Sequence, residues 1–275
     1  MTQTAPSIVH PVQHRYADPT TDVPAQWNSV LDVLHAHKSV RRYLPDPVSP
    51  ETIQLLVSAA QSAATSSNLQ AWSVVEVRDA DRRARLAEVA GGQAHIEQAP
   101  VLLVWVADFA RLRQLAHDHD APLDGADYLE TSFVGVIDAA LAAQNAVLAA
   151  ESLGLGTVYI GALRNDPERV AAELNLPAHV FPVFGLVVGH PDPTEGTRIK
   201  PRLPQAAVLH HETYDLSSQR EPVAAYEHRI GEIYTDQGLP YSWTERVLAR
   251  LASKEALYGR HRLRESLIAL GFRLR

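Results

Sequence analysis

Four apolar segments along the chain have the pattern of β-strands. They read WSVVEV at 72–77, VLLVWVA at 101–107, TVYIG at 157–161 and FPVFGLVVG at 181–189. Residues 101–107 and 183–188 are apolar at odd and even positions alike, which is typical of strands covered on both faces. The sequence therefore predicts strands that lie inside the molecule.

Amphipathic segments before and between these strands predict helices. Their ranges are 27–37, 51–63, 81–90, 127–153 and 167–174. In the first, Val30, Val33 and Leu34 share one face. The second follows Ser49-Pro50, a good helix start because serine caps the first turn and proline fits the first helical position.

The longest predicted helix, 127–153, contains DAALAAQNAVLAAESLG and is followed by Gly154, which suits a C-cap. Its alanines permit close approach of another element. Because the helix is apolar nearly all round, it is expected at the centre of the molecule or at a subunit interface.

The chain changes character after PRLP at 201–204. Residues 205–275 contain no convincing strand but three polar amphipathic helices, at about 221–236, 243–256 and 261–270. The proline-rich, polar start predicts a mobile or draped arm. We therefore expect an α+β protein with an arm (1–26), a core (27–204) and a helical extension (205–275) that wraps the core or a partner.

Composition narrows the function. The chain has 275 residues and a net charge of −7, which argues against nucleic acid or an anionic membrane as a general partner. It has no cysteine, so disulfides, iron–sulfur clusters, thiolate zinc sites and cysteine nucleophiles are excluded. No apolar run has the length of a signal peptide or a membrane span. A cytoplasmic protein is the expectation.

Common catalytic motifs do not fit the chain. The run GLGTVYIG at 154–161 has the wrong spacing for a dinucleotide-binding fingerprint and precedes a strand instead of following one. No Walker loop, HExxH or GxSxG occurs. In HDHD at 117–120, neighbouring side chains point in different directions, which favours a solvated helix end over a metal site.

Three polar elements remain as candidates for binding an anionic ligand. The first is HKSVRRY at 37–43, a cationic cluster in an acidic chain; the second is the hydroxyl- and amide-rich loop 65–70; the third is Lys200-Pro201-Arg202. A lysine and an arginine two positions apart on an extended segment project to the same side and can clamp a phosphate. Loop side chains such as Gln70 can satisfy a polar ring edge. Spacing alone does not show that the three elements converge, and a basic run is more often a solvated face.

Six segments taken together resemble a known family, the large oxygen-insensitive nitroreductases and NADPH–flavin oxidoreductases. In order they are HKSVRRY, SAATSSNLQAW, GGQAHIEQAPVLLVWVADF, AAQNAVLAAESLGLGTVYIGALRN, LPAHVFPVFGLVVGHP and KPRLP. The resemblance covers about residues 35–275. It implies a homodimer with a mostly antiparallel central sheet, a long interface helix, and one FMN in each of two grooves at the subunit interface.

The resemblance also implies which residues hold FMN. His37, Lys38, Ser39 and Arg41 match the segment for the phosphate, ribityl chain and pyrimidine edge, with Arg41 on either the phosphate or the ring. The pair Lys200 and Arg202 matches a second phosphate-side group. The loop residues Thr65, Ser66 and Ser67 match a segment that approaches from the partner subunit. The remaining matched positions line the ring and ribityl regions: Gln93, Tyr159, Ile160, Gly161 and Ala162.

The reaction implied by the resemblance is a ping-pong transfer of two electrons from NADPH or NADH, through FMN, to a nitroaromatic, a quinone or a flavin. The cofactor carries this chemistry, so the sequence predicts no catalytic side chain and no metal ligand. A small-molecule acceptor and a second copy of the chain are the expected partners.

The chain departs from the family in its C-terminal extension. NADPH-specific members carry arginines in the loop before a tryptophan, whereas residues 235–243 here read TDQGLPYSW. A further family arginine follows Lys-Glu-Ser, but Leu257 follows Lys254-Glu255-Ala256. NADH, either nucleotide or another reductant therefore remains open. So does a non-enzymatic flavin-binding protein, and a flavin-free anion-binding module is the third alternative.

Overall fold

The computed structural model describes residues 8–275. They form two compact units, each described here by itself. The arm unit comprises residues 8–38 and 198–256, and the sheet unit comprises residues 39–197 and 257–275. The chain therefore passes from the arm unit to the sheet unit, returns to the arm unit, and ends in the sheet unit.

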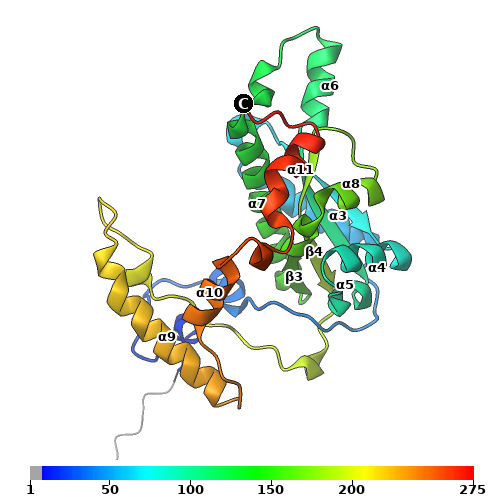
Figure 1. Ribbon diagram of the computed structural model, residues 1–275. Helices are drawn as coiled ribbons and strands as arrows, with labels where there is room; N and C mark the ends of the chain where they lie inside the picture. Colours follow the sequence, from blue (N-terminus) through cyan, green and yellow to red (C-terminus); the bar gives the residue numbers. More distant parts are fainter. Residues whose placement is uncertain (1–7) are drawn as a thin grey trace, which may run out of the picture. The chain divides into compact units, whose positions relative to one another are not determined.

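A four-stranded sheet lies at the centre of the sheet unit (Figure 1). Its strands are β1 (Trp72–Val77), β2 (Val101–Asp108), β3 (Gly156–Ile160) and β4 (Val180–Gly189). They are arranged in the order β1-β2-β4-β3, and all neighbours are antiparallel. All four predicted strands are confirmed to within one residue at each end. The register of β2 against β4 shifts after Trp105, where Val183 is left over as a bulge next to Pro182.

Helices cover both faces of this sheet. One face carries α3 (Pro50–Gln61) and α7 (Leu129–Ser152), and the other carries α4 (Ala80–Val89), α5 (Ala94–Gln98) and α8 (Pro167–Glu173). Along β2, Leu103 and Trp105 pack with α3 and α7, whereas Leu102 and Val104 pack in the other cluster. The prediction that β2 is buried on both faces is confirmed, and so is the α+β class.

The long helix α7 approaches the sheet closely at Gly135. A Cβ at this position would lie 2.7 Å from a ring carbon of Phe109 and 2.8 Å from the Cβ of Ala107. Only a residue without a side chain fits this spacing. The helix ends as predicted, with Gly154 beyond its last turn at φ +78°.

The arm unit is helical in its described part. It contains α1 (Pro11–Tyr16), α2 (Ser29–Ala36), α9 (Arg220–Thr235) and α10 (Trp243–Leu251). The predicted helices 27–37, 221–236 and 243–256 are confirmed, although the last ends at Leu251. The predicted apolar face of α2 is wrong as a packing surface, because Val30 and Leu34 are exposed. The helix packs instead through His35, whose ring lies 4.8 Å from that of Trp27.

Three short helices were not predicted. They are α1, α5 and α6 (Ala110–Asp118). Each spans at most nine residues, which is too short for a helical period to stand out. The predicted helix 261–270 is confirmed as α11 (Leu263–Ala269), which belongs to the sheet unit.

Candidate functional site

The middle of the cationic cluster lies along β3 of the sheet unit. Ser39 forms a parallel bridge with Thr157, and the N–H of Val40 donates to the carbonyl of Thr157 at 2.9 Å. Val40 is buried, while Arg41 is exposed. Gly156 makes this docking possible, because a Cβ there would lie 2.9 Å from the Val40 side chain. The stretch is extended here, and it presents the Arg41 side chain at the surface.

Arg41 is fixed by an acid far along the chain. Its N–H donates to Oε1 of Glu195 at 2.8 Å. His95 on α5 belongs to the same electrostatic group. Burial lowers the pKa of His95, the positive charge of Arg41 lowers it further, and Glu195 opposes this. Neither His95 nor Glu195 was selected from the sequence, because nothing in their local pattern indicates that they face Arg41.

The end of β3 carries four of the predicted site residues. The hydroxyl of Tyr159 donates to Oε1 of Gln144 on α7 at 3.4 Å, and its ring packs edge-on against Phe184 at 5.0 Å. Burial raises the pKa of Tyr159. Ile160 is buried, and a 3-10 turn begins at Gly161. The structure thus brings Ser39 and Arg41 alongside β3, whose last residues Tyr159 and Ile160 lead into the turn that contains Gly161 and Ala162.

Gln93 stands at the start of α5, in the same unit. It is the residue that precedes the first helical turn, and its side-chain amide donates to the carbonyl of Ala90 at 2.9 Å. Gly91 and Gly92, just before it, have φ values of +83° and +73°, so the turn needs residues without a Cβ. Gln93 is half-buried.

A buried carboxylate on α7 holds the predicted loop 65–70. Asp138 is 1% exposed, and it accepts hydrogen bonds from the Thr65 hydroxyl at 2.6 Å, the Ser66 N–H at 3.1 Å and the Ala71 N–H at 3.1 Å. The Thr65 Oγ1 in turn accepts from the N–H of Gln70 at 2.9 Å. Asp138 was missed by the sequence analysis. Its signal was a lone acid on the inner face of an otherwise apolar helix.

The loop held by Asp138 has an uncommon backbone. Ser67, Asn68 and Gln70 have φ values of +49°, +57° and +50°, a region that non-glycine residues enter at a cost. Arg111 on α6 adds hydrogen bonds to the carbonyls of Gln70 at 3.2 Å and Trp72 at 2.7 Å. Among the described residues, the loop is therefore fixed to α7 and α6, while its own Ser66 and Ser67 remain exposed.

The other predicted phosphate-side residues lie in the arm unit. His37 and Lys38 end the segment after α2, and Lys200 and Arg202 lie on an irregular segment before α9. The guanidinium of Arg15 joins these two segments. It donates to the carbonyls of His35 at 2.8 Å, His37 at 2.7 Å and Lys200 at 3.2 Å.

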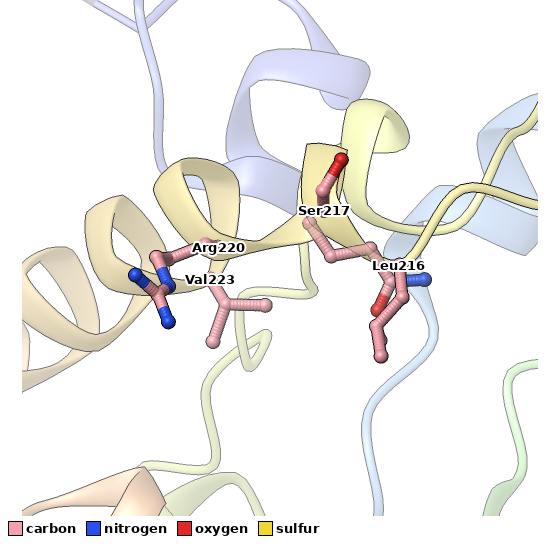
Figure 2. A pocket seen from close by; sticks show the side chains of 5 residues that line it. Leu216, Ser217, Arg220 and Val223 are labelled. Carbon is pink, nitrogen blue, oxygen red and sulfur yellow. The ribbon is translucent and has the colours of Figure 1, made fainter.

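Two hollows in the described part of the surface are lined mostly by residues outside the predicted site. One, of about 780 Å³, lies in the arm unit (Figure 2) and is lined by Leu216, Ser217, Gln219, Arg220 and Val223, none of them a predicted site residue. The other, of about 520 Å³, lies between the loop 65–70 and α6 in the sheet unit and includes Gln70 and Arg111.

The loop 235–243 contains no arginine, but Arg246 of the following helix α10 contacts it. Tyr234 and Tyr241 stack with ring centroids 4.1 Å apart, and the guanidinium carbon of Arg246 lies 4.6 Å from the centroid of Tyr241. Arg246 follows Trp243 by one turn of α10. The sequence analysis missed this cation, because it considered only the residues before Trp243.

The antiparallel four-stranded sheet, the long central helix and the helical C-terminal segment define the class of protein. Residues 34–190 match the Nitroreductase family, and residues 200–275 match the Nitroreductase family, C-terminal domain. The chain belongs to this family, which confirms the resemblance seen in the sequence.

Three similar proteins match this chain over nearly their whole length. FMN reductase [NAD(P)H] from Bacillus subtilis is 40% identical over 255 residues, which are 90% of this chain and 99% of that protein. The structure of B. megaterium NfrA2 superimposes with a TM-score of 0.85 at 38% identity, covering 90% of this chain and 100% of that one. The NADPH:FMN oxidoreductase from Vibrio harveyi, solved with NAD⁺, gives 0.80 at 34% identity, over 90% of this chain and 100% of that one.

Replacing Asp138 tests whether its carboxylate holds the loop. We expect Asp138→Asn to lower the free energy of unfolding by about 2 kcal/mol, because the amide brings a donor to a position that three donors already face. Urea denaturation followed by circular dichroism measures this change. The matched pair Thr65→Ser and Thr65→Val serves as a control: serine keeps the hydroxyl and should be near neutral, whereas valine should be destabilising. Wild-type stability of Asp138→Asn would contradict this account.

Proposed function

We propose that this protein is an NAD(P)H-dependent oxidoreductase that uses FMN and reduces small molecules. The chain belongs to the Nitroreductase family, and its relatives are named FMN reductase and NADPH:FMN oxidoreductase. Both findings agree with the enzyme class and the cofactor predicted from the sequence. Bound FMN supplies the acceptance of a hydride from NAD(P)H and the release of two electrons to a nitroaromatic, a quinone or a flavin.

The observation that carries the proposal in the structure is the meeting of two cationic segments within the arm unit. The Arg15 guanidinium donates to the carbonyls of His37 on one segment and Lys200 on the other, and these segments also carry Lys38 and Arg202. Like charges gathered in this way are stabilised when an anion binds between them. A phosphate monoester such as that of FMN fits this donor set, because lysine and arginine together supply both charge and directed N–H groups.

The remaining residues of the proposed FMN site are polar or small. Ser39 and Arg41 follow Lys38 directly along the chain. The permanent positive charge of the Arg41 guanidinium would favour electron uptake by a nearby flavin ring. Gln93 and the strand end from Tyr159 to Ala162 line the ring and ribityl side. The loop residues Ser66, Ser67 and Gln70 are exposed, and the Thr65 hydroxyl donates to Asp138, which fixes the loop backbone. These assignments extend the family resemblance to this chain.

The rival function, a flavin-binding protein without a nicotinamide site, rested on missing arginines in the loop 235–243. Arg246 weakens this argument, because its guanidinium lies over Tyr241 of that loop. The relatives, whose names describe reductases and oxidoreductases, also favour the enzyme. We retain NADPH and NADH as alternative reductants, and we propose a cytoplasmic location, with which a chain free of cysteine is compatible.

We further propose that the chain acts as a homodimer through the outer face of α7. Four apolar residues spaced four apart share this face, and each is 44–55% exposed: Leu129, Phe133, Ile137 and Leu141. Such a stripe on a helix is typical of a protein–protein contact. By length and composition α7 could also cross a membrane, but its inner face packs in the core through buried alanines, as in the central helix of a globular protein. The helical extension 205–275 would then wrap this chain or its partner.

The proposed enzyme is tested by the visible absorption spectrum of the purified protein. We expect a flavin band that bleaches when NADH or NADPH is added without oxygen, because hydride transfer reduces the ring, and colour that returns when menadione is added. Comparing the bleaching rates with the two nucleotides identifies the reductant. A flavin band that neither nucleotide bleaches would favour the rival function, and a protein that takes up no FMN would exclude both.

The proposed phosphate side is tested by removing single charges. Lys200→Ala and Arg41→Ala should each raise the dissociation constant of FMN by about tenfold or more, because a hydrogen bond to a charged group contributes about 1.5–3 kcal/mol. Fluorescence of the released flavin measures this constant. Lys254→Ala is the matched control, since this exposed lysine of the arm unit lies outside the proposed site. Unchanged FMN affinity in both variants would sink the assignment.

The proposed dimer is tested on the stripe of α7. Ile137→Glu should shift the protein from dimer to monomer, because the new carboxylate would be buried in an apolar contact without a partner. We expect the dimer dissociation constant to rise at least about tenfold. Light scattering coupled to size exclusion measures the mass. Leu115→Glu, on the similarly exposed Leu115 of α6, should leave the mass unchanged. A wild-type protein that is already monomeric would contradict the proposal.

A further inference from the structure

Arg15 lies in a part of the chain that the family models do not cover, since they begin at residue 34. Residues 1–26 were expected to form a mobile or draped arm. In the structure, Arg15 is 8% exposed. Its buried guanidinium donates to three backbone carbonyls on two segments that are remote in the sequence, those of His35 and His37 and that of Lys200, 185 residues further on.

The backbone of Arg15 is also tied to the second segment. Its carbonyl accepts from the N–H of Arg202 at 3.1 Å. Arg15 therefore contacts the segment 200–202 through both its side chain and its main chain. Both ends of the Lys200-Pro201-Arg202 stretch are fixed by this one residue, and the Nη1 of Arg202 closes the turn on the Lys200 carbonyl at 2.9 Å.

The arm holds Arg15 in a folded frame. His10 caps α1 by accepting from the N–H of Val12, and the side chain of Gln13 donates to the carbonyls of Pro19 and Thr21. On the other side of the arm, Arg229 of α9 pairs with Asp18 at 2.8 Å. Because the frame is closed on both sides, the guanidinium of Arg15 has a defined position relative to the two segments.

We propose that Arg15 is a positioning residue, through which the N-terminal arm sets the spacing of the cations that bind the FMN phosphate. The inference rests on the proposed FMN site. The planar guanidinium has five donors in a fixed fork and stays protonated. By donating to carbonyls of both segments, it can hold them at a fixed distance from each other. Lys38, Lys200 and Arg202 then start from fixed backbone positions, and less of their freedom is lost when the phosphate binds.

This role predicts a loss that is specific for the phosphate. The contacts of Arg15 go to the segments that carry the phosphate-side cations, and the other residues proposed to line the ring and ribityl chain, Gln93 and residues 159–162, lie elsewhere along the chain. Removing Arg15 should therefore weaken the binding of FMN while leaving the binding of riboflavin, which has the same ring and no phosphate, nearly unchanged. A general loss of stability would weaken both ligands alike.

The experiment compares FMN and riboflavin binding to full-length Arg15→Met and to wild type, by quenching of flavin fluorescence after the bound flavin is removed. We expect the dissociation constant of FMN to rise about tenfold or more and that of riboflavin to change by less than about twofold. Arg83→Met is the matched control: Arg83 is also 8% exposed and donates to two backbone carbonyls, of Arg78 and Glu97, in the sheet unit. It should affect the two flavins equally.

The outcomes separate this inference from the proposed function. Wild-type FMN affinity in Arg15→Met, or an equal loss for FMN and riboflavin, would overturn the role of Arg15, while Lys200→Ala still tests the site itself. If Arg15→Met does not fold, Arg15→Lys replaces it, because lysine keeps the charge but lacks the fork. The same selective loss for FMN is expected there, and wild-type affinity for both flavins would overturn the proposal. A wild-type protein that binds no FMN would instead remove the proposed function.

Discussion

The loop 65–71 depends on one buried carboxylate. Asp138 lies inside the core with 1% exposure, and its oxygens accept three hydrogen bonds from that loop. Burying a carboxylate is costly unless donors replace the water it loses, and the loop supplies those donors only in a conformation with three non-glycine residues at positive φ. The cost of that backbone and the cost of burying the charge are therefore met by the same hydrogen bonds. Since Asp138 is on α7, the loop is fixed to the helix whose outer face exposes the apolar stripe.

A second constraint is electrostatic. The chain has a net charge of −7, which disfavours long polyanions, yet it gathers cations on two segments of the arm unit. A small anion that reaches them gains the local attraction without the repulsion that a polyanion would meet across the surface. Holding the segments by their carbonyls, as Arg15 does, leaves the side chains of Lys200 and Arg202 at the surface. The same protein can thus be acidic overall and selective for a phosphate monoester.

The sequence predicted the elements better than their contacts. The strands β2 and β4 were recognisable because a strand buried on both faces is apolar at odd and even positions alike, and α3 because Ser49 and Pro50 mark its start. The cationic cluster and the polar loop were recognised as residue types. What joins them was not, because Asp138 acts across 67–73 residues and Arg15 across as many as 185. A local pattern contains the chemistry of a side chain but not its distance from a partner that the fold brings near.

The loop 235–243 shows how such an omission alters a functional argument. Counting bases within the loop gave none, and this suggested that the 2′-phosphate of NADPH would meet no cation. Arg246 enters from the next helical turn and lies over Tyr241. A cation–π contact at an exposed site contributes about 0.5–1 kcal/mol, whereas a hydrogen bond from a charged group contributes about 1.5–3 kcal/mol. A phosphate within reach would therefore draw the guanidinium from the ring at a net gain. The absence of arginine before Trp243 is thus no argument that nicotinamide binding has been lost.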